Sequence, residues 1–169
     1  MTLETKLDNL PIEALKTQLN GYVITPDSDQ YDEARAVWNG MIDHYPALII
    51  RCHSTADVVA TVNFTRSHAL RLSVRGGGHN VAGSAVVDDG VVVDLSEMKN
   101  VDVDVDKQIV HAQGGVTLGD LDAETQKFNL AVPSGVASET GIAGLTLGGG
   151  FGWLRNKYGL TCDNLIGAE

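Results

Sequence analysis

The sequence predicts an α+β fold in two parts that divide near residue 97: a small α/β part followed by a part built on antiparallel strands. Wholly apolar runs separated by helical segments predict buried parallel strands in the first part. The strictly alternating segment Val101 to Val105 then marks a change to half-exposed strands. We expect a helical N-terminal segment over residues 1–42, the small α/β part over 43–97 and the second part over 98–169.

Apolar spacing and capping residues define the elements of the first part. The expected elements are helices over Pro11 to Leu19 and Asp29 to Trp38, a strand over Ala47 to Ile50, a helix to about His68, and strands over Leu70 to Val74 and Val91 to Leu95. Ser54 and Asp57 resemble a capping box that opens the third helix. The strand–helix–strand order predicts a parallel pair with a right-handed crossover.

In the second part, Val101 to Val105 and Ile109 to His111 form an expected hairpin that turns at Asp106-Lys107. A helix should open at Thr117 or Gly119 and direct its apolar side chains inward. These side chains are Leu118, Leu121 and Phe128. The segment from Pro133 to Gly152 contains too much glycine for regular structure, and we expect it to wrap a ligand.

The composition, with 43% hydrophobic and 20% charged residues over 169 positions, is that of an ordinary globular protein. A formal charge of −10 with no cluster of Lys and Arg argues against a nucleic-acid partner. No stretch approaches the roughly 20 apolar residues of a membrane span, and Met1 to Lys6 lacks an apolar signal core. We therefore expect a cytoplasmic protein with neither a membrane nor a nucleic-acid partner.

No metal site is expected. The acidic run Asp102 to Asp106 would need glycine and glutamate at the sixth and twelfth positions of a calcium loop, where Lys107 and Gln113 stand. The remaining candidate metal ligands, which are histidines and cysteines, do not have the sequence spacing of a metal site. They are His44, His53, His68, His111, Cys52 and Cys162.

The stretch from Arg75 to Gly83 carries the strongest functional signal, because Gly76-Gly77-Gly78 allows several backbone N–H groups to point toward one anion. Arg75 adds a positive charge, and His79 adds a nucleophile. A second cluster, Gly148 to Gly152, predicts a diphosphate cofactor bound by two loops. Neither cluster is a P-loop, and a third Rossmann glycine is replaced by Val81. A purely structural role for the glycines remains an alternative.

Several motifs in order resemble the FAD-linked oxidases of the berberine-bridge-enzyme-like group. They are Arg75 to Asn80, Asp94 to Met98, Gly114-Gly115, Pro133 to Gly135, Thr140 to Leu154, Arg155 to Gly159, and Asp163 to Leu165. The resemblance covers roughly Ala47 to Glu169. It implies a FAD-binding domain of the vanillyl-alcohol-oxidase (PCMH) type, with two α+β subdomains that clasp FAD.

The resemblance also implies the cofactor-binding residues. They are Arg75, Gly76, Gly77, Gly78, His79, Asn80, Val81, Gly83, Ser84, Pro133, Gly135, Thr140, Gly141, Gly144, Leu145, Thr146, Gly148, Gly149, Gly150, Gly152, Trp153, Tyr158 and Gly159. His79 should bond covalently to the 8α-methyl carbon of the flavin, which should raise its reduction potential. Many members form a second bond through a cysteine where this chain has Ala137, so a single link is expected. The sequence itself leaves Trp153 and Tyr158 as either core aromatics or neighbours of a planar ring.

The implied function is oxidation of an alcohol, amine or sugar C–H bond in a small-molecule substrate, with electron transfer to O2. Members of the group are longer, and the substrate domain and general base are expected beyond Glu169, so no catalytic residue is assigned. Three alternatives stay open: a stand-alone flavin-binding module, half of a split enzyme completed by another chain, and a remnant with empty loops.

Overall fold

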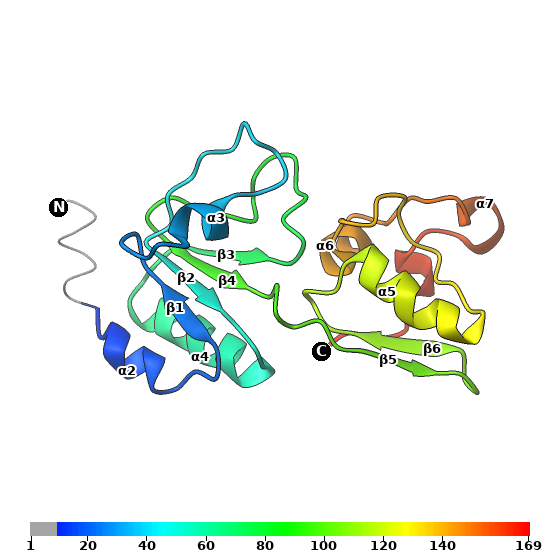
Figure 1. Cartoon of the computed structure of the whole chain (residues 1–169), viewed down its shortest axis with the longest axis horizontal. Helices are drawn as coiled ribbons and strands as arrows, with labels where there is room; N and C mark the ends of the chain where they lie inside the picture. The colour runs from blue at the N-terminus through cyan, green and yellow to red at the C-terminus, as the bar shows by residue number, and fades with distance from the viewer. Residues whose placement is uncertain (1–9) are drawn as a thin grey trace. The chain divides into compact units, whose positions relative to one another are not determined.

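The computed structural model describes residues 10–169, so residues 1–9 of the expected N-terminal segment lie outside the described residues. Contacts divide the chain into two compact units, of which the first ends at Glu97 and the second begins at Met98 (Figure 1). Each unit has its own sheet. The structure contains helices, a mixed sheet and an antiparallel sheet, in agreement with the predicted α+β class.

The sheet of the first unit has the order β1-β2-β4-β3. Its strands are β1 (Tyr22–Ile24), β2 (Leu48–Arg51), β3 (Leu72–Arg75) and β4 (Val91–Asp94). The strands β2 and β3 run parallel as predicted, but β4 lies between them and pairs with both. The antiparallel strand β1 was not predicted, because three residues are too few for an alternating pattern to stand out.

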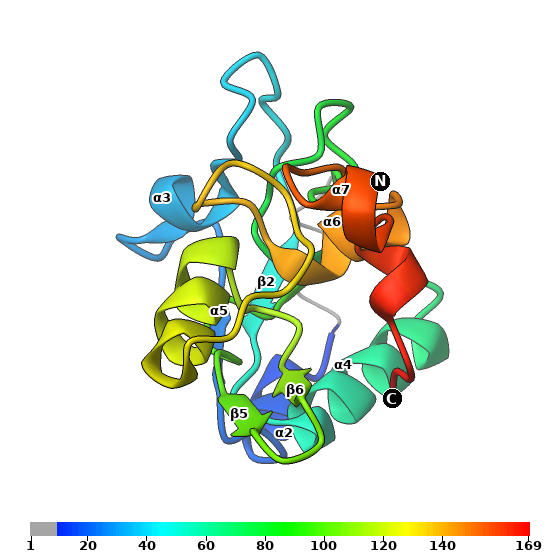
Figure 2. The ribbon, with the colours of Figure 1, turned by 90° about the vertical axis from the view of Figure 1, so that its right-hand side faces the viewer.

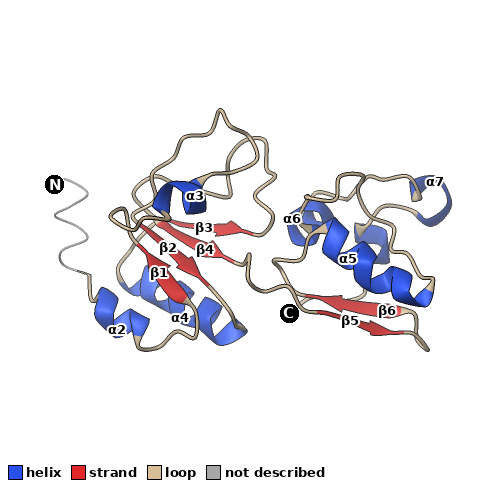
Figure 3. Ribbon diagram, viewed as in Figure 1, coloured by secondary structure: helices blue, strands red, loops and turns tan. Residues whose placement is uncertain are grey.

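Helices lie on both faces of this sheet (Figure 3). On one face, the short helix α3 (Tyr31–Arg35) packs Tyr31 and Ala34 against Ile49 and Val92, which are register partners. On the other face lies α4 (Thr55–Ser67) (Figure 3). The helix α2 (Ile12–Lys16) contacts α4. Both α2 and α3 are shorter than predicted.

The helix α4 confirms the predicted capping box: Asp57 N–H donates to Ser54 Oγ, and the Asp57 carboxylate accepts from the backbone N–H of Ser54. Its buried face is polar and consists of Asp57, Thr61 and Thr65. The two threonine hydroxyls donate to the carbonyl oxygens four residues earlier, at 2.8 and 2.7 Å. These bonds satisfy buried hydroxyls that would otherwise destabilise the fold.

The second unit begins with the predicted hairpin of β5 (Val101–Asp104) and β6 (Ile109–Ala112). The helix α5 (Leu118–Thr125) packs against it (Figure 2). Thr117, rather than Gly119, caps this helix, and Leu118 and Leu121 are buried as predicted. The inward placement of Phe128 was wrong. This residue ends the 3-10 helix η1 (Gln126–Phe128), after which left-handed Asn129 turns the chain, and it is 45% exposed.

The expectation of no regular structure between Pro133 and Gly152 was also wrong. The helix α6 (Ile142–Leu147) forms there, because Ile142 N–H donates to Val116 O and Gly141 bridges to Thr117. These long-range bonds fix the start of a helix that the glycine content had obscured. The short helices α7 (Arg155–Tyr158) and η2 (Cys162–Asn164) follow.

Candidate functional site

The predicted glycine loop leaves the carboxyl end of β3, the end at which α/β sheets tend to place ligands. Gly78 and Gly83 both have positive φ, at +68° and +78°. At Gly83 a Cβ atom would lie 2.8 Å from Ile42 Cγ2, so a side chain does not fit. The loop is therefore held against the segment of residues 36–42, which precedes it by some 40 positions.

Hydrogen bonds within the loop fix its second half. The Asn80 side-chain oxygen accepts from both the backbone N–H and the hydroxyl of Ser84, at 3.2 and 2.8 Å. Gly83 N–H donates to Asn80 O at 3.1 Å. The exposed Val81 carbonyl accepts from Asn39 Nδ2 at 2.8 Å. The loop is thus a preformed turn that follows His79.

Arg75, at the start of the loop, has one nitrogen that the protein does not satisfy. Its Nη1 donates to the carbonyl oxygen of Ala34, while its buried Nε has no hydrogen-bond partner. The register partner Asp94 is fully buried and pairs with Arg51 instead, at 2.8 Å. Among residues 10–169, no carboxylate forms an ion pair with Arg75. The guanidinium charge of Arg75 is therefore not neutralised by an ion pair within the described residues.

His79 lies beside Trp38, which the sequence analysis did not assign to the site. The imidazole and indole rings stack with their centroids 5.1 Å apart and their planes 22° from parallel. Trp38 N–H donates to Gly78 O at 3.2 Å. The contact joins residues 41 positions apart, and no local sequence pattern indicates it.

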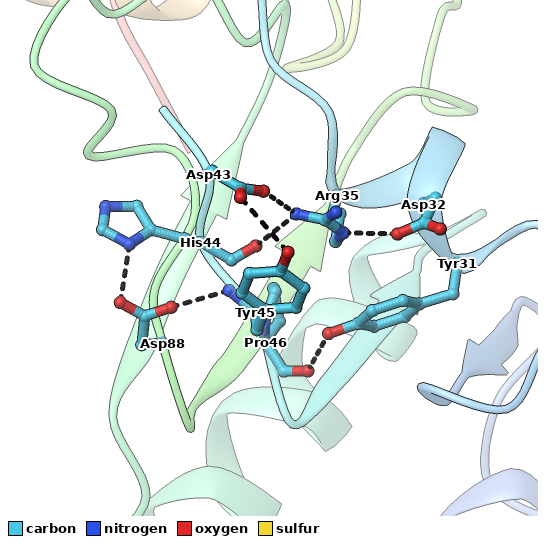
Figure 4. A network of polar contacts seen from close by, with 8 residues as sticks. All are labelled: Tyr31, Asp32, Arg35, Asp43, His44, Tyr45, Pro46 and Asp88. Atoms are coloured by element: carbon cyan, nitrogen blue, oxygen red, sulfur yellow. Dashed lines mark hydrogen bonds and ion pairs between the residues drawn. The ribbon is translucent and has the colours of Figure 1, made fainter. Parts of the chain in front are cut away.

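A polar network anchors the segment that carries Trp38 (Figure 4). Arg35 donates to Asp32 at 2.7 Å, to Asp43, and to the carbonyl oxygen of His44. The hydrogen bond from Arg35 holds the pKa of Asp43 below its usual range. The Asp88 carboxylate accepts a hydrogen bond from the backbone N–H of Tyr45 through Oδ1. Its other oxygen, Oδ2, lies 2.6 Å from His44 Nδ1. Arg35 and Asp43 thus fix the chain on both sides of residues 36–42.

Two further groups of this network have shifted pKa values. The backbone N–H of Tyr45, followed by the His44 side chain, lowers the pKa of Asp88. Burial raises the pKa of Tyr31 to about 12, and its hydroxyl donates to Pro46 O at 2.7 Å. The network therefore contains a carboxylate stabilised in its charged form and a phenol stabilised in its neutral form near neutral pH.

In the second unit, Pro133 to Gly135 and Gly150 to Gly152 lie side by side. A Cβ on Gly152 would overlap the carbonyl oxygen of Ser134, and a Cβ on Gly135 would come within 3.0 Å of Leu118 Cδ1. A Cβ on Gly150 would overlap the Thr161 side chain. Packing within the chain therefore already requires part of the second glycine cluster.

Gly144 is different, because no neighbour among residues 10–169 requires this position to be glycine. It lies within α6, is exposed, and a Cβ there would meet no atom within 4 Å. Glycine inside a helix costs about 0.5–1 kcal/mol relative to alanine. The α6 surface at Gly144 is thus open to close approach by a ligand.

Trp153 and Tyr158 are not core aromatics, since they are 85% and 50% exposed. Tyr158 ends α7, and its carbonyl accepts from Asn164 Nδ2 at 2.9 Å. Gly159, with φ +80°, follows and lies against Asp163. Both aromatic rings are available to a partner group.

The structure brings the predicted site residues together within each unit. In the first unit, Arg75, Gly76, Gly77, Gly78, His79, Asn80, Val81, Gly83 and Ser84 form one loop. In the second unit, the predicted residues lie before, within and after α6. The segment before the helix contains Pro133, Gly135, Thr140 and Gly141, and the helix contains Gly144, Leu145 and Thr146. The segment after it contains Gly148, Gly149, Gly150, Gly152, Trp153, Tyr158 and Gly159. Leu145 packs against Gly135 and Gly150 and so links these segments.

Two kinds of feature are absent from residues 10–169. These residues contain no group of three or more His, Cys, Asp or Glu side chains placed to hold a metal ion. In the same residues, no helix combines the length and the apolar character needed to cross a membrane.

The comparisons with known proteins agree on one protein family. Residues 46–169 match the family model described as FAD binding domain. (R)-6-hydroxynicotine oxidase of Paenarthrobacter nicotinovorans is 41% identical over 155 residues, which are 92% of this chain and 34% of that protein. The chain thus spans about a third of the length of the curated relatives it matches.

Solved structures agree. A 6-hydroxy-D-nicotine oxidase from Arthrobacter nicotinovorans has a TM-score of 0.84 and 41% identity, covering 86% of this chain and 32% of that one. A glucooligosaccharide oxidase from Acremonium strictum, which has 6-S-cysteinyl, 8α-N1-histidyl FAD, has a TM-score of 0.83 and 31% identity, covering 90% and 32%. The berberine-bridge-enzyme-like proteins are also among the relatives, with 37% identity to one from Arabidopsis thaliana over 129 residues. The chain belongs to the FAD-binding-domain family of the FAD-linked oxidoreductases.

Proposed function

We propose that this chain binds FAD through the glycine loop and holds it covalently through His79, as the flavin-binding part of an oxidase. The observation that carries the proposal is the position of His79, directly after the turn at Gly78 and beyond the carboxyl end of β3. A related oxidase, the glucooligosaccharide enzyme of Acremonium strictum, has a histidyl FAD. Its second, cysteinyl link has no counterpart here, because Ala137 occupies the position that the family resemblance assigns to that cysteine.

The residues of the first unit fit a diphosphate. Arg75 offers a buried Nε–H without a partner, and the adjacent Gly76 and Gly77 offer backbone N–H groups. In a chain with a formal charge of −10, such a local cluster of donors is needed to bind a polyanion. We assign the loop from Arg75 to Ser84 to the diphosphate.

In the second unit, the observation that supports a ligand is the open surface at Gly144. The same unit exposes two large apolar side chains, Leu147 in α6 and Trp153 in the segment that follows it, at 89% and 85%. An apolar surface of this kind suits a planar ring system. We assign α6 and the segment that follows it to contacts with the cofactor.

Bound FAD supplies the acceptor for a hydride, and the protein supplies binding, orientation and electrostatics. In the attachment, His79 would supply the imidazole nitrogen that bonds to the 8α carbon of FAD, and the imidazole and that methyl carbon would each give up one hydrogen. Dioxygen would take up the two electrons and two protons as hydrogen peroxide, so the link would have lost two hydrogens overall.

We further propose that the whole protein oxidises a C–H bond of an alcohol, amine or sugar and passes the electrons to dioxygen. The support is that relatives include oxidases named for 6-hydroxynicotine and for glucooligosaccharide. The substrate class is proposed from these relatives.

The test is to incubate the purified chain with FAD and to run it on a denaturing gel under ultraviolet light. We expect a fluorescent band that His79→Ala abolishes and that His111→Ala, an exposed histidine in β6, preserves. A band that survives in His79→Ala would overturn the assignment of the link. Bleaching of the bound flavin by candidate substrates, with release of peroxide, then separates an enzyme from a flavin carrier.

A further inference from the structure

The imidazole of His79 is oriented by a ring rather than by a hydrogen bond. Within residues 10–169 no protein group hydrogen-bonds this ring, and its close side-chain partner is the indole of Trp38 at 5.1 Å between centroids. The near-parallel planes, at 22°, place one face of the imidazole against the indole. A stack restricts the ring plane but leaves both ring nitrogens, which lie at the edge, free to react.

The backbone around Trp38 is tied to the glycine loop on both sides of His79. Trp38 N–H donates to the carbonyl oxygen of Gly78, which precedes His79. Asn39 Nδ2 donates to the carbonyl oxygen of Val81, which follows it by two residues. The backbone that carries the indole is therefore held beside the backbone that carries the imidazole.

The ends of the segment are fixed as well. Arg35 immediately precedes the segment of residues 36–42, and Asp43 immediately follows it. The Arg35 guanidinium donates hydrogen bonds to Asp32 and to Asp43 (Figure 4). The guanidinium also lies 4.0 Å from the centroid of the Tyr45 ring, at a distance favourable for a cation–π contact. This arrangement gives Trp38 a defined position although its side chain is 63% exposed.

We propose that Trp38 is a positioning residue for the covalent attachment of FAD: it holds the plane of the His79 imidazole so that a ring nitrogen is presented to the flavin. The inference rests on the proposed covalent link at His79. Without the stack, the imidazole would sample several χ1 and χ2 rotamers, and only part of this population would be competent to react. Removal of the indole should therefore slow attachment without weakening reversible binding of the diphosphate, which the loop backbone and Arg75 provide.

The experiment compares the wild-type chain with Trp38→Ala, Trp38→Phe and the control Met41→Ala. Met41 is 90% exposed on the same segment and has no part in the stack. The rate of covalent attachment is followed by the mass of the denatured chain after addition of FAD. Reversible affinity is measured by flavin fluorescence in the His79→Ala background. We expect Trp38→Ala to slow attachment about five- to tenfold with reversible affinity unchanged, and Trp38→Phe to restore most of the rate.

A second measurement tests the stack without flavin. In the NMR spectrum of the free chain, ring current from the indole should shift the carbon-bound protons of the His79 imidazole upfield, and Trp38→Ala should remove this shift. The proposal is overturned by attachment at the wild-type rate in Trp38→Ala, by an equal loss of reversible affinity, or by absence of the ring-current shift. If the wild-type chain attaches no FAD while the shift is present, the covalent link itself is wrong, and this role of Trp38 is wrong with it.

Discussion

Arg75 donates from Nη1 to the carbonyl oxygen of Ala34, 41 residues earlier, and so joins the start of the glycine loop to the end of α3. Its buried Nε keeps a free donor beside the loop. This one side chain therefore links the loop to α3, and we propose that it also contributes to binding of the diphosphate.

Replacement of Arg75 by methionine should weaken reversible FAD binding about ten- to a hundredfold, because hydrogen bonds to charged groups contribute about 1.5–3 kcal/mol. The measurement is flavin fluorescence titration in the His79→Ala background. Arg66→Met is the matched control, since Arg66 is exposed on α4 and, among residues 10–169, its side chain donates only to Asn63. Equal affinity in Arg75→Met and wild type would remove Arg75 from the site.

Gly144→Ala should have opposite effects on folding and on binding. The chain should be stabilised by about 0.5–1 kcal/mol, because alanine is the better helix former and meets no atom within 4 Å. FAD affinity should fall by about fivefold or more, because the methyl group occupies the surface that we assign to the cofactor. Urea unfolding and FAD titration measure the two effects, with Gly167→Ala as a control. A more stable variant with unchanged affinity would contradict the assignment of α6.

Asp57→Asn should destabilise the first unit by about 1–3 kcal/mol at neutral pH. The Asp57 carboxylate accepts from the backbone N–H groups of Asn20, Gly21, His53 and Ser54, and an amide cannot accept all of these bonds. Although burial opposes ionisation, these donors hold the pKa of Asp57 below its usual value.

Because this pKa is lowered by folding, the stabilisation is fully present above the unfolded value of about 3.9 and is lost as pH falls through the folded value. The stability difference between wild type and Asp57→Asn should therefore shrink from pH 6 to pH 3. Urea unfolding at both pH values checks this. A difference that stays constant would show that the carboxylate charge does not matter.

Gly152→Ala should destabilise the second unit by about 1–3 kcal/mol or more, because the new methyl group overlaps the backbone of Ser134. Hydrogen exchange of the Thr161 and Cys162 amides, which bond to the Gly150 and Gly149 carbonyls, reports the loss. In Gly148→Ala the nearest atom lies 3.6 Å away, and protection should be retained. Unchanged exchange in Gly152→Ala would mean that the two segments are not in contact.

Local signals in the sequence were sufficient for much of the fold. The cap at Ser54, the apolar run of β4 and the alternation from Val101 are each set by residues within one element. Phe128 was misplaced because an αL turn at Asn129, rather than helical periodicity, decides its direction. The strand β1 was missed because its three residues are too few for an alternating pattern to stand out.

In the candidate site, too, local sequence indicates some features and the packing of the fold decides others. The loop from Arg75 to Ser84 is contiguous, and its glycines are visible in the sequence. Trp38, by contrast, lies 41 residues away from His79, in a segment that leaves α3 where Ala36 adopts an extended conformation. The sequence also does not distinguish Gly144, which packing leaves free, from Gly152, which packing requires. The two glycines can be distinguished only from the positions of the atoms around each of them.

The central claim is that His79 bonds covalently to FAD, and peptide mass mapping tests it most directly. Trypsin should cleave after Arg75 and Lys99, and the resulting peptide 76–99 contains His79 as its one histidine and no cysteine. After incubation with FAD, denaturation and digestion, we expect this peptide to carry the mass of one FAD less two hydrogens, and peptide 128–155, which contains Ala137, to be unmodified. An unmodified peptide 76–99, or flavin on another peptide, would contradict the account.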